Sequence, residues 1–322
     1  MMSENNQDKL FEAVDARAGL AGSNRMEILL FSLGTEETFG INVFKVREVC
    51  TTPFVTKAPN MPKGVEGLIS LRGNVIPVLS LAKILGLLQR EDRLGEAMMV
   101  TEYSKRTLGF LVSAVDRIVR VDWQKVRAPE NLASYSDNYI TAITELPDGK
   151  IVSIVDVETV LANTFGDPAM PVIAPLQNGQ LYNVFFVDDS SVARRKISEV
   201  LDKLGVKHKY ATNGLEAWNR LSALASLAQQ NGTHVSHEVD LVLLDAEMPE
   251  MDGYVLTRKI KADKRFNGIP VVMHSSLSSE ANRAMGKQVG VDNYVSKFDA
   301  EVLADTLRPL LQREKILNSE QN

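Results

Sequence analysis

Carboxylate, hydroxyl and amino side chains stand where apolar runs of this sequence stop. Asp188 and Asp189 follow one such run, Asp245 follows a second, Ser275 a third and Lys297 a fourth. If these runs are parallel strands of one sheet, their ends meet at a single edge, where open α/β sheets bind ligands. Carboxylates crowded there repel one another unless a cation lies among them, and oxygen ligands suit Mg²⁺ better than zinc.

A carboxylate in such a cluster can attack a phosphoryl group when a metal and a cation neutralise the phosphoryl oxygens. We predict Asp245 as this nucleophile, with Asp188 and Asp189 holding Mg²⁺. Lys297 would pair with the phosphoryl oxygens and Ser275 would donate a hydrogen bond to them. The alternative is a salt-bridge cluster that serves only the structure, a set that strand ends rarely assemble by chance.

The elements that must position these side chains alternate between strand and helix from Leu181 onward. The pattern predicts a doubly wound parallel sheet of five strands, in the flavodoxin-like α/β class. The expected strands are Tyr182 to Val187, Lys207 to Tyr210, Leu241 to Leu244, Ile269 to His274 and Asp292 to Val295. The expected helices are Val192 to Leu204, Leu215 to Gln229, Tyr254 to Lys261, Glu280 to Val289 and Glu301 to Gln312. We call residues 181–313 the α/β half.

Residues 26–165, the β-rich half, consist of short apolar runs separated by turn residues, which is typical of a barrel or a sandwich. Nine strands are expected between Glu27 and Asp156, with helical periodicity only at Leu81 to Leu87 and Val157 to Leu161. This half has no histidine and no Gly-rich loop, so we interpret it as a binding module rather than a catalytic one. The single cysteine, Cys50, is interpreted as a buried apolar residue.

Three segments of the β-rich half resemble the CheW family of chemotaxis adaptors. They read GINVFKVREV at 40–49, GVEGLISLRGNVIPV at 64–78 and GFLVSAVD at 109–116, in the order of the family. The resemblance implies an all-β domain of two small β-barrels that bridges a chemoreceptor tip to the histidine kinase CheA. It makes Arg72, which Gly73 places in a tight turn, a candidate partner contact. Val46 and Val49 are interpreted as core residues that can also line the partner groove.

The α/β half resembles the receiver domain of response regulators. The matching pieces are FVDDS at 186–190, LDAEMP at 244–249, Asp252-Gly253, PVVMHSS at 270–276 and YVSK at 294–297. The resemblance implies that Asp245 is the phosphoacceptor and adds Asp245 and the backbone carbonyl of Glu247 to the Mg²⁺ ligands. It also implies that Tyr294 is the switch residue, which turns inward when Ser275 moves toward the phosphoryl group.

Three features depart from the receiver pattern. Phe298 follows Lys297 where the family has proline, so a cis bond is not favoured by residue type. Glu247 places an acid two residues after the acceptor, which is expected to change the phosphoryl lifetime. The stretch 217–237 is longer than usual and predicts a second helix that extends to about Asn231-Gly232.

Composition excludes several function classes. The formal net charge is −5, and neither half is basic: 18 Lys and Arg face 19 Asp and Glu from Leu181 onward, and 18 face 22 before it. Nucleic-acid binding and a polybasic membrane anchor are therefore not expected. No apolar run approaches the roughly 20 residues of a membrane span, and no signal-peptide pattern opens the chain. A cytoplasmic protein, without membrane insertion, is the expectation.

The combination of a CheW-like module and a receiver is the architecture of the CheV family of chemotaxis coupling proteins. The expected layout is an N-terminal segment 1–25 with a short helix, a coupling domain 26–165, a linker 166–180, a receiver 181–313 and a tail 314–322. The chain is then a phosphorylation-tuned adaptor or phosphate sink at the receptor array, not an enzyme beyond its own phosphoryl transfer and dephosphorylation. The alternatives are a signalling scaffold outside chemotaxis and a haloacid-dehalogenase-type phosphatase, whose second acid is replaced by Ser190.

Overall fold

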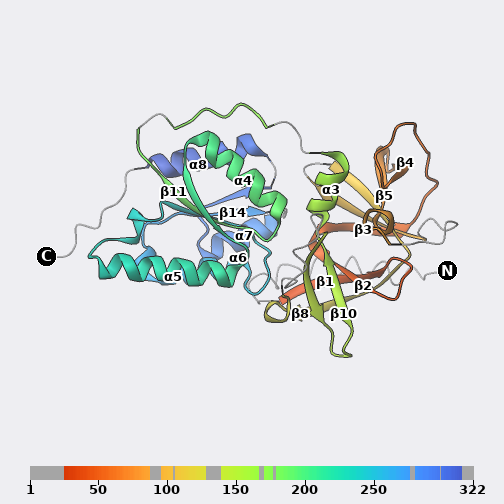
Figure 1. The fold of residues 1–322 in the computed structure, drawn as a ribbon, viewed down its shortest axis with the longest axis horizontal. Helices are drawn as coiled ribbons and strands as arrows, with labels where there is room; N and C mark the ends of the chain where they lie inside the picture. Colours follow the sequence, from red (N-terminus) through yellow and green to blue (C-terminus); the bar gives the residue numbers. More distant parts are fainter. Residues whose placement is uncertain are drawn as a thin grey trace. The chain divides into compact units, whose positions relative to one another are not determined.

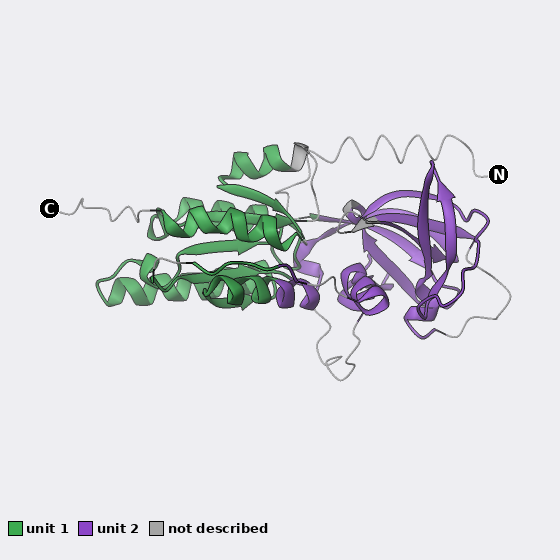
Figure 2. Cartoon of the chain, turned by 90° about the horizontal axis from the view of Figure 1, so that it is seen from above, with its two compact units in different colours: residues 1–25, 172–188, 197–322 green, residues 26–171, 189–196 purple. Residues whose placement is uncertain are grey.

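A computed structural model describes residues 25–87, 96–103, 106–127, 139–166, 170–176, 179–275, 280–297 and 299–313. They form two compact units, one of residues 26–171 and 189–196, the other of 172–188 and the residues from 197 onward (Figure 2). The predicted helix of the N-terminal segment and the predicted tail lie outside the described residues. No helix in the described part of the chain is long and apolar enough to cross a membrane.

The β-rich half contains two sheets of five strands each. The first has the order β8-β1-β2-β10-β9 and the second β3-β6-β7-β5-β4. A bridge from Arg127 to Ile143 connects the segment after β8 to β9, and a bridge from Thr56 to Leu68 connects the segment after β3 to β4. Because each bridge links one edge strand to the segment that follows the opposite edge strand, both sheets close through these segments into the two small barrels that the family resemblance implies. The strands are β1 (Arg25–Ser32), β2 (Thr38–Asn42), β3 (Val46–Thr51), β4 (Val65–Leu71), β5 (Asn74–Ser80), β6 (Ala97–Tyr103), β7 (Arg106–Val112), β8 (Ala114–Asp122), β9 (Ile140–Glu145) and β10 (Ile151–Val155).

Helical segments in this half are short. They are η2 (Val43–Lys45), α2 (Leu81–Ile84), η3 (Trp123–Lys125) and α3 (Val157–Phe165). One core cluster joins side chains of both sheets, including Phe31 of β1 and Phe110 of β7, with Val160 of α3. α3 begins where Asp156, as its N-cap, accepts hydrogen bonds from the Glu158 and Thr159 amides.

The spacing of Val43, Val46 and Val49, each three residues from the next, predicts a short helical turn or an irregular edge, and both are present. Val43 lies in η2, while Val46 and Val49 belong to β3, an edge strand of its sheet. The register between β3 and β6 shifts between Val46 and Glu48, which is a β-bulge. A bulge disrupts the two-residue alternation by which a strand is recognised, so the sequence pattern did not reveal β3 as a strand.

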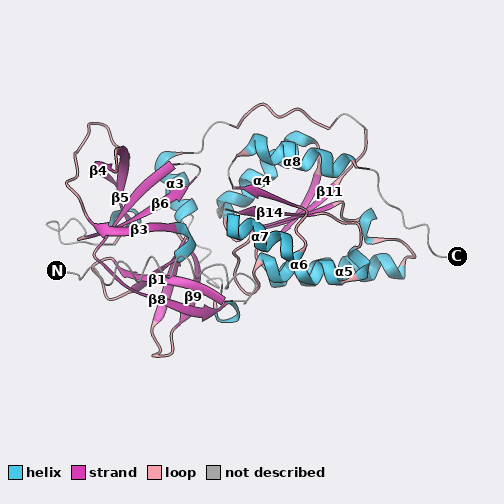
Figure 3. Ribbon diagram, turned by 180° about the vertical axis from the view of Figure 1, so that it is seen from behind, coloured by secondary structure: helices cyan, strands magenta, loops and turns pink. Residues whose placement is uncertain are grey.

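The α/β half is built on the predicted parallel sheet of five strands, and their order is β12-β11-β13-β14-β15. α4 and α8 lie on one face of this sheet, and α5, α6 and α7 lie on the other (Figures 1 and 3). This is the flavodoxin-like doubly wound arrangement. Its strands are β11 (Asn183–Val187), β12 (Lys207–Ala211), β13 (Leu241–Leu244), β14 (Val271–Ser275) and β15 (Asn293–Ser296). Its helices are α4 (Ser191–Leu204), α5 (Gly214–Gln230), α6 (Gly253–Ala262), α7 (Glu280–Val289) and α8 (Ala300–Gln312), with short turns η4 (Val235–His237) and η5 (Lys264–Phe266).

The central position of β13 explains where the site must form. β13 pairs in parallel with β11 and β14, and all four of its residues are buried. A parallel sheet aligns the carboxyl ends of its strands, so Asp245 must emerge between the residues that follow β11 and β14. The long second helix is also present, since α5 runs to Gln230 and is capped by Asn231.

Candidate functional site

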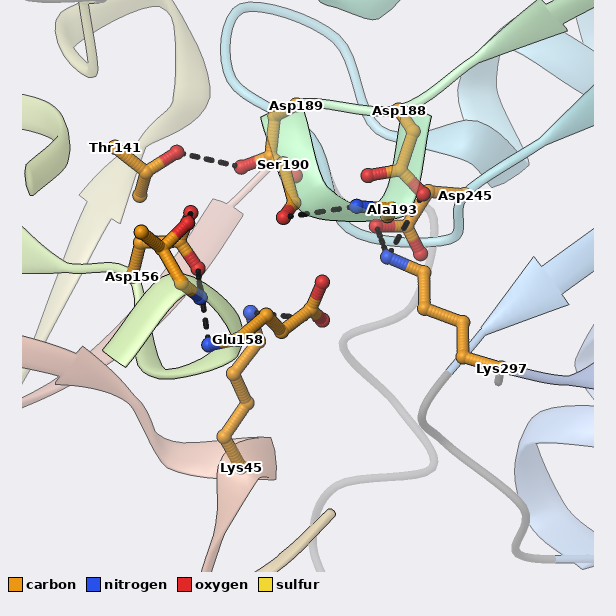
Figure 4. Close-up of polar contacts among 11 residues, drawn as sticks. Lys45, Thr141, Asp156, Glu158, Asp188, Asp189, Ser190, Ala193, Asp245 and Lys297 are labelled. Atoms are coloured by element: carbon orange, nitrogen blue, oxygen red, sulfur yellow. Dashed lines mark hydrogen bonds and ion pairs between the residues drawn. The ribbon is translucent and has the colours of Figure 1, made fainter. Parts of the chain in front are cut away.

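Lys297 lies between two carboxylates at the carboxyl edge of the parallel sheet. Its Nζ is 2.7 Å from Asp245 Oδ2 and 2.9 Å from Asp188 Oδ2, and Figure 4 shows it reaching both. All three side chains are buried, Asp188 completely. Charge-assisted hydrogen bonds of this length hold the lysine where it can meet the oxygens of a group transferred to Asp245. The structure thus brings together three of the predicted site residues.

The third acid completes a set of oxygen ligands. Asp188, Asp189 and Asp245 each offer one carboxylate oxygen, and these oxygens lie within 4.8 Å of one another. One lysine does not balance three carboxylates, so the cluster has an excess negative charge that a divalent cation would neutralise. A set of ligands made of carboxylate oxygens alone fits Mg²⁺. Which cation binds, and whether the Glu247 carbonyl joins the set, stay predictions.

The loop after Asp245 is shaped by an Asp-Gly pair. Asp252 is the N-cap of α6 and accepts a hydrogen bond from the Val255 amide at 2.7 Å. The Gly253 amide donates to the Ala246 carbonyl oxygen at 2.9 Å. A Cβ at Gly253 would collide with the backbone carbonyl oxygen of Asp245 itself. The residue type at Gly253 is therefore dictated by how closely α6 approaches the backbone of the acceptor.

Gly253→Ala is expected to lower the free energy of unfolding by about 2–3 kcal/mol, because the new methyl group must displace the Asp245 backbone. Phosphoryl uptake at Asp245 should slow as well. Gly286→Ala in α7 is the matched control, since its Cβ would only touch Tyr294 Cδ2 at 3.4 Å. Urea unfolding of both variants checks this, and equal midpoints would contradict it.

Tyr294, the predicted switch residue, points toward the site. Its hydroxyl shares a hydrogen bond with the Ser275 hydroxyl, and its ring lies under the guanidinium of Arg283 at 5.3 Å from the ring centroid. Burial is the largest influence on this hydroxyl; together with the Asp245 and Glu247 carboxylates it raises the pKa of Tyr294 to about 12. Ser275, almost fully buried, accepts a backbone hydrogen bond from Lys297 at 2.9 Å. Asp245, the Ser275 hydroxyl and the Tyr294 ring therefore lie close to one another.

Two of the departures from the receiver pattern are the acid at Glu247 and the bond between Lys297 and Phe298. Glu247 is half-buried, and its carboxylate lies close enough to Tyr254 and Tyr294 to raise the pKa of both, after the larger effect of burial. Its effect on the phosphoryl lifetime stays a prediction. The bond between Lys297 and Phe298 involves a residue outside the described part of the chain.

The candidate partner contact in the β-rich half occupies an unusual turn. Arg72 and Gly73 connect β4 to β5, and both have positive φ, 49° and 83°. A two-residue hairpin of this kind prefers asparagine followed by glycine, so an arginine here adds backbone strain. The Arg72 side chain is 70% exposed and its Nη2 lies 2.5 Å from Glu48 Oε2. Val46, by contrast, is buried and Val49 half-buried, so Val46 presents little surface to a partner.

Two buried carboxylates and a lysine form a charged cluster in the β-rich half, and no local sequence pattern predicts this cluster. Glu158 of α3 is 1% exposed, Asp156 is 5% exposed, and Lys45 Nζ lies 3.6 Å from Glu158 Oε1 (Figure 4). Burial, then the Glu158 carboxylate, raise the pKa of Asp156, while Lys45 lowers it. The three residues were not among the predicted ones, because Lys45 and Glu158 are remote in sequence and meet only in the folded chain.

Comparison with known proteins agrees with the division into a β-rich half and an α/β half. The model of the CheW-like domain matches residues 27–165, and that of the response regulator receiver domain matches residues 184–308. Chemotaxis protein CheV3 of Helicobacter pylori is 31% identical over 285 residues, which cover 86% of this chain and 90% of the relative. Chemotaxis protein CheV1 of the same organism is 26% identical over 324 residues, covering 93% of this chain and 97% of the relative.

Proposed function

The chain belongs to the CheV family of chemotaxis proteins, and from this premise we propose that it couples chemoreceptors to the histidine kinase CheA under control of a phosphoryl group on Asp245. It is a signalling adaptor made of a CheW-like domain and a receiver domain. In this proposal it works in the cytoplasm at the receptor array. The family supports neither a scaffold outside chemotaxis nor a haloacid-dehalogenase-type phosphatase.

The observation that carries the phosphorylation proposal is the position of Lys297, at 2.7 Å from Asp245 and 2.9 Å from Asp188. An Asp245 carboxylate oxygen attacks phosphorus, the new P–O bond forms, and the bond to the donor's leaving group breaks with its electron pair. Lys297 moves its contact from the carboxylate to the phosphoryl oxygens, and the Ser275 hydroxyl donates to another of them. Mg²⁺ held by Asp188, Asp189 and Asp245 would neutralise the remaining charge.

A phosphoryl group on Asp245 supplies the regulatory signal. It replaces the single negative charge of the Asp245 carboxylate with about −1.5 to −2 charges and three acceptor oxygens, in a buried site where the carboxylates of Asp188 and Asp189 remain. Lys297 and Ser275 are the described side chains best placed to respond, and Tyr294 contacts Ser275. The deciding experiment is phosphoryl uptake by the full chain from acetyl phosphate and Mg²⁺, read as a gain in mass.

The partner contact of the CheW-like domain is assigned to the hairpin at Arg72. Strain in a turn persists when it serves a function, and a left-handed arginine whose side chain is 70% exposed fits that pattern. Two large apolar side chains in the same barrel are exposed as well, Phe54 at 88% and Val75 at 70%. Arginine and exposed apolar side chains are residue types that protein-binding surfaces use.

Arg72→Asn separates a structural role from a binding role. Asparagine tolerates the left-handed conformation, so we expect the free energy of unfolding to rise by up to about 1 kcal/mol. Capture of the full chain by immobilised kinase should fall about tenfold, because the cation is lost. Arg117→Asn, on an exposed part of β8, is the control and should leave capture unchanged. Undiminished capture by Arg72→Asn would remove Arg72 from the interface.

A further inference from the structure

Part of the segment that connects the two domains is bound to the α/β half. Arg308 of α8 donates two hydrogen bonds to successive carbonyl oxygens, from Nη2 to Ala174 at 2.7 Å and from Nη1 to Pro175 at 3.3 Å. The Leu176 amide donates to the Leu204 carbonyl oxygen at 3.0 Å. In Figure 1 the segment passes alongside α8 before it enters β11. Residues 174–176, which we call the strap, are thus held at three consecutive positions.

The residue types suit this arrangement. Ala174 precedes a proline and is therefore biased toward an extended backbone, while Pro175 has a fixed φ. Ordering such a segment loses little conformational entropy. The guanidinium of Arg308 has several donors in a rigid fork, which suits two neighbouring carbonyl oxygens. Leu204 is the last residue of α4, so its carbonyl lacks a partner within the helix and the Leu176 amide supplies one.

The helix that holds the strap starts at the phosphorylation site. Lys297, which contacts Asp245 at 2.7 Å, lies three residues before the start of α8 at Ala300. Arg308 lies further along the same helix of 13 residues. A displacement of Lys297 toward a phosphoryl group would therefore reach the amino-terminal end of α8, and the helix would carry it to Arg308.

We propose that the strap couples the receiver to the CheW-like domain, with Arg308 as the residue that holds it. This inference rests on the proposed function, because it requires the receiver to respond to phosphorylation. With the strap bound, the free connection after α3 is limited to residues 166–173, which span at most about 26–29 Å, against about 50 Å for residues 166–180. A shorter tether raises the effective concentration of one domain around the other.

Hydrogen exchange of the Leu176 amide in the full chain tests whether the strap is bound. We expect Arg308→Gln to speed exchange at Leu176 by about tenfold while amides of β11 and β13 keep their rates, which shows that the domain stays folded. Arg258→Gln, on the exposed face of α6, is the matched control and should leave Leu176 unchanged. Equal rates at Leu176 in the wild type and Arg308→Gln would overturn the strap.

The coupling role has its own readout. Arg308→Gln should gain the same phosphoryl mass from acetyl phosphate and Mg²⁺ as the wild type, yet the ratio of kinase capture with and without phosphorylation should approach one. If Arg308→Gln frees Leu176 and that ratio stays at the wild-type value, the coupling role is wrong. If the wild type takes up no phosphoryl group, the proposed function fails and the coupling role with it, while the exchange data still decide whether the strap is bound.

Discussion

Asp245→Asn is expected to reduce phosphoryl uptake from acetyl phosphate by about 100-fold or more, because the substitution removes the attacking carboxylate and leaves its surroundings in place. The amide oxygen of asparagine can still accept a hydrogen bond from Lys297, which now lies 2.7 Å from the carboxylate. One negative charge is also lost from a cluster of three acids, so the fold should be as stable as the wild type or more so. Intact-mass measurement of the full chain in acetyl phosphate and Mg²⁺ gives the result.

The controls decide what the loss means. Asp305→Asn changes an exposed acid on α8 and should keep full uptake. A chelator should reduce uptake by the wild type, because the excess charge of Asp188, Asp189 and Asp245 is then not neutralised. Fragmentation of the peptide that contains residues 241–254 separates modification of Asp245 from modification of Glu247. Uptake by Asp245→Asn at the wild-type level would reject the assignment of the acceptor.

The α/β half could be predicted from sequence because its local and global signals agree. Five apolar runs alternate with five amphipathic ones, and the right-handed crossover rule then aligns the strand ends. That rule alone brings Asp188 and Asp245 together with Lys297, although the residues lie far apart in the chain. The Asp252-Gly253 pair also marks the start of α6 in the sequence.

Other features of the fold could not be predicted, because the contacts that produce them leave no pattern in the local sequence. A β-bulge near Val46 removed the alternation that would have revealed β3. The proline-rich composition of segment 166–180 predicts a semi-extended linker but not its attachment to α8, because hydrogen bonds from a remote arginine to its carbonyl oxygens leave no trace in composition. The same holds for Lys45 and Glu158, which only the packing of η2 against α3 brings within 3.6 Å.

Lys45→Met should lower the free energy of unfolding by about 3 kcal/mol at neutral pH, since it leaves two buried carboxylates without their cation. Lys83→Met is the matched control. Lys83 also pairs with an acid, Glu66 at 2.7 Å, but its side chain is 56% exposed, so the loss should be at most about 1 kcal/mol. Urea unfolding at pH 7.5 measures both, and equal losses would mean that burial of the Lys45 pair is energetically irrelevant.

The pH dependence identifies the cause of that loss. The folded-state pKa of Asp156 is raised above its ordinary value of 3.8, first by burial and then by Glu158. A carboxyl with a raised folded-state pKa binds its proton more tightly when folded, so its contribution to stability declines as pH rises from about 3.8 through that pKa. Lys45 opposes the shift, so Lys45→Met extends the decline to higher pH. The deficit of Lys45→Met should therefore shrink as pH is lowered from 7.5 toward 5, whereas a deficit that came only from lost packing of the lysine stem would not change.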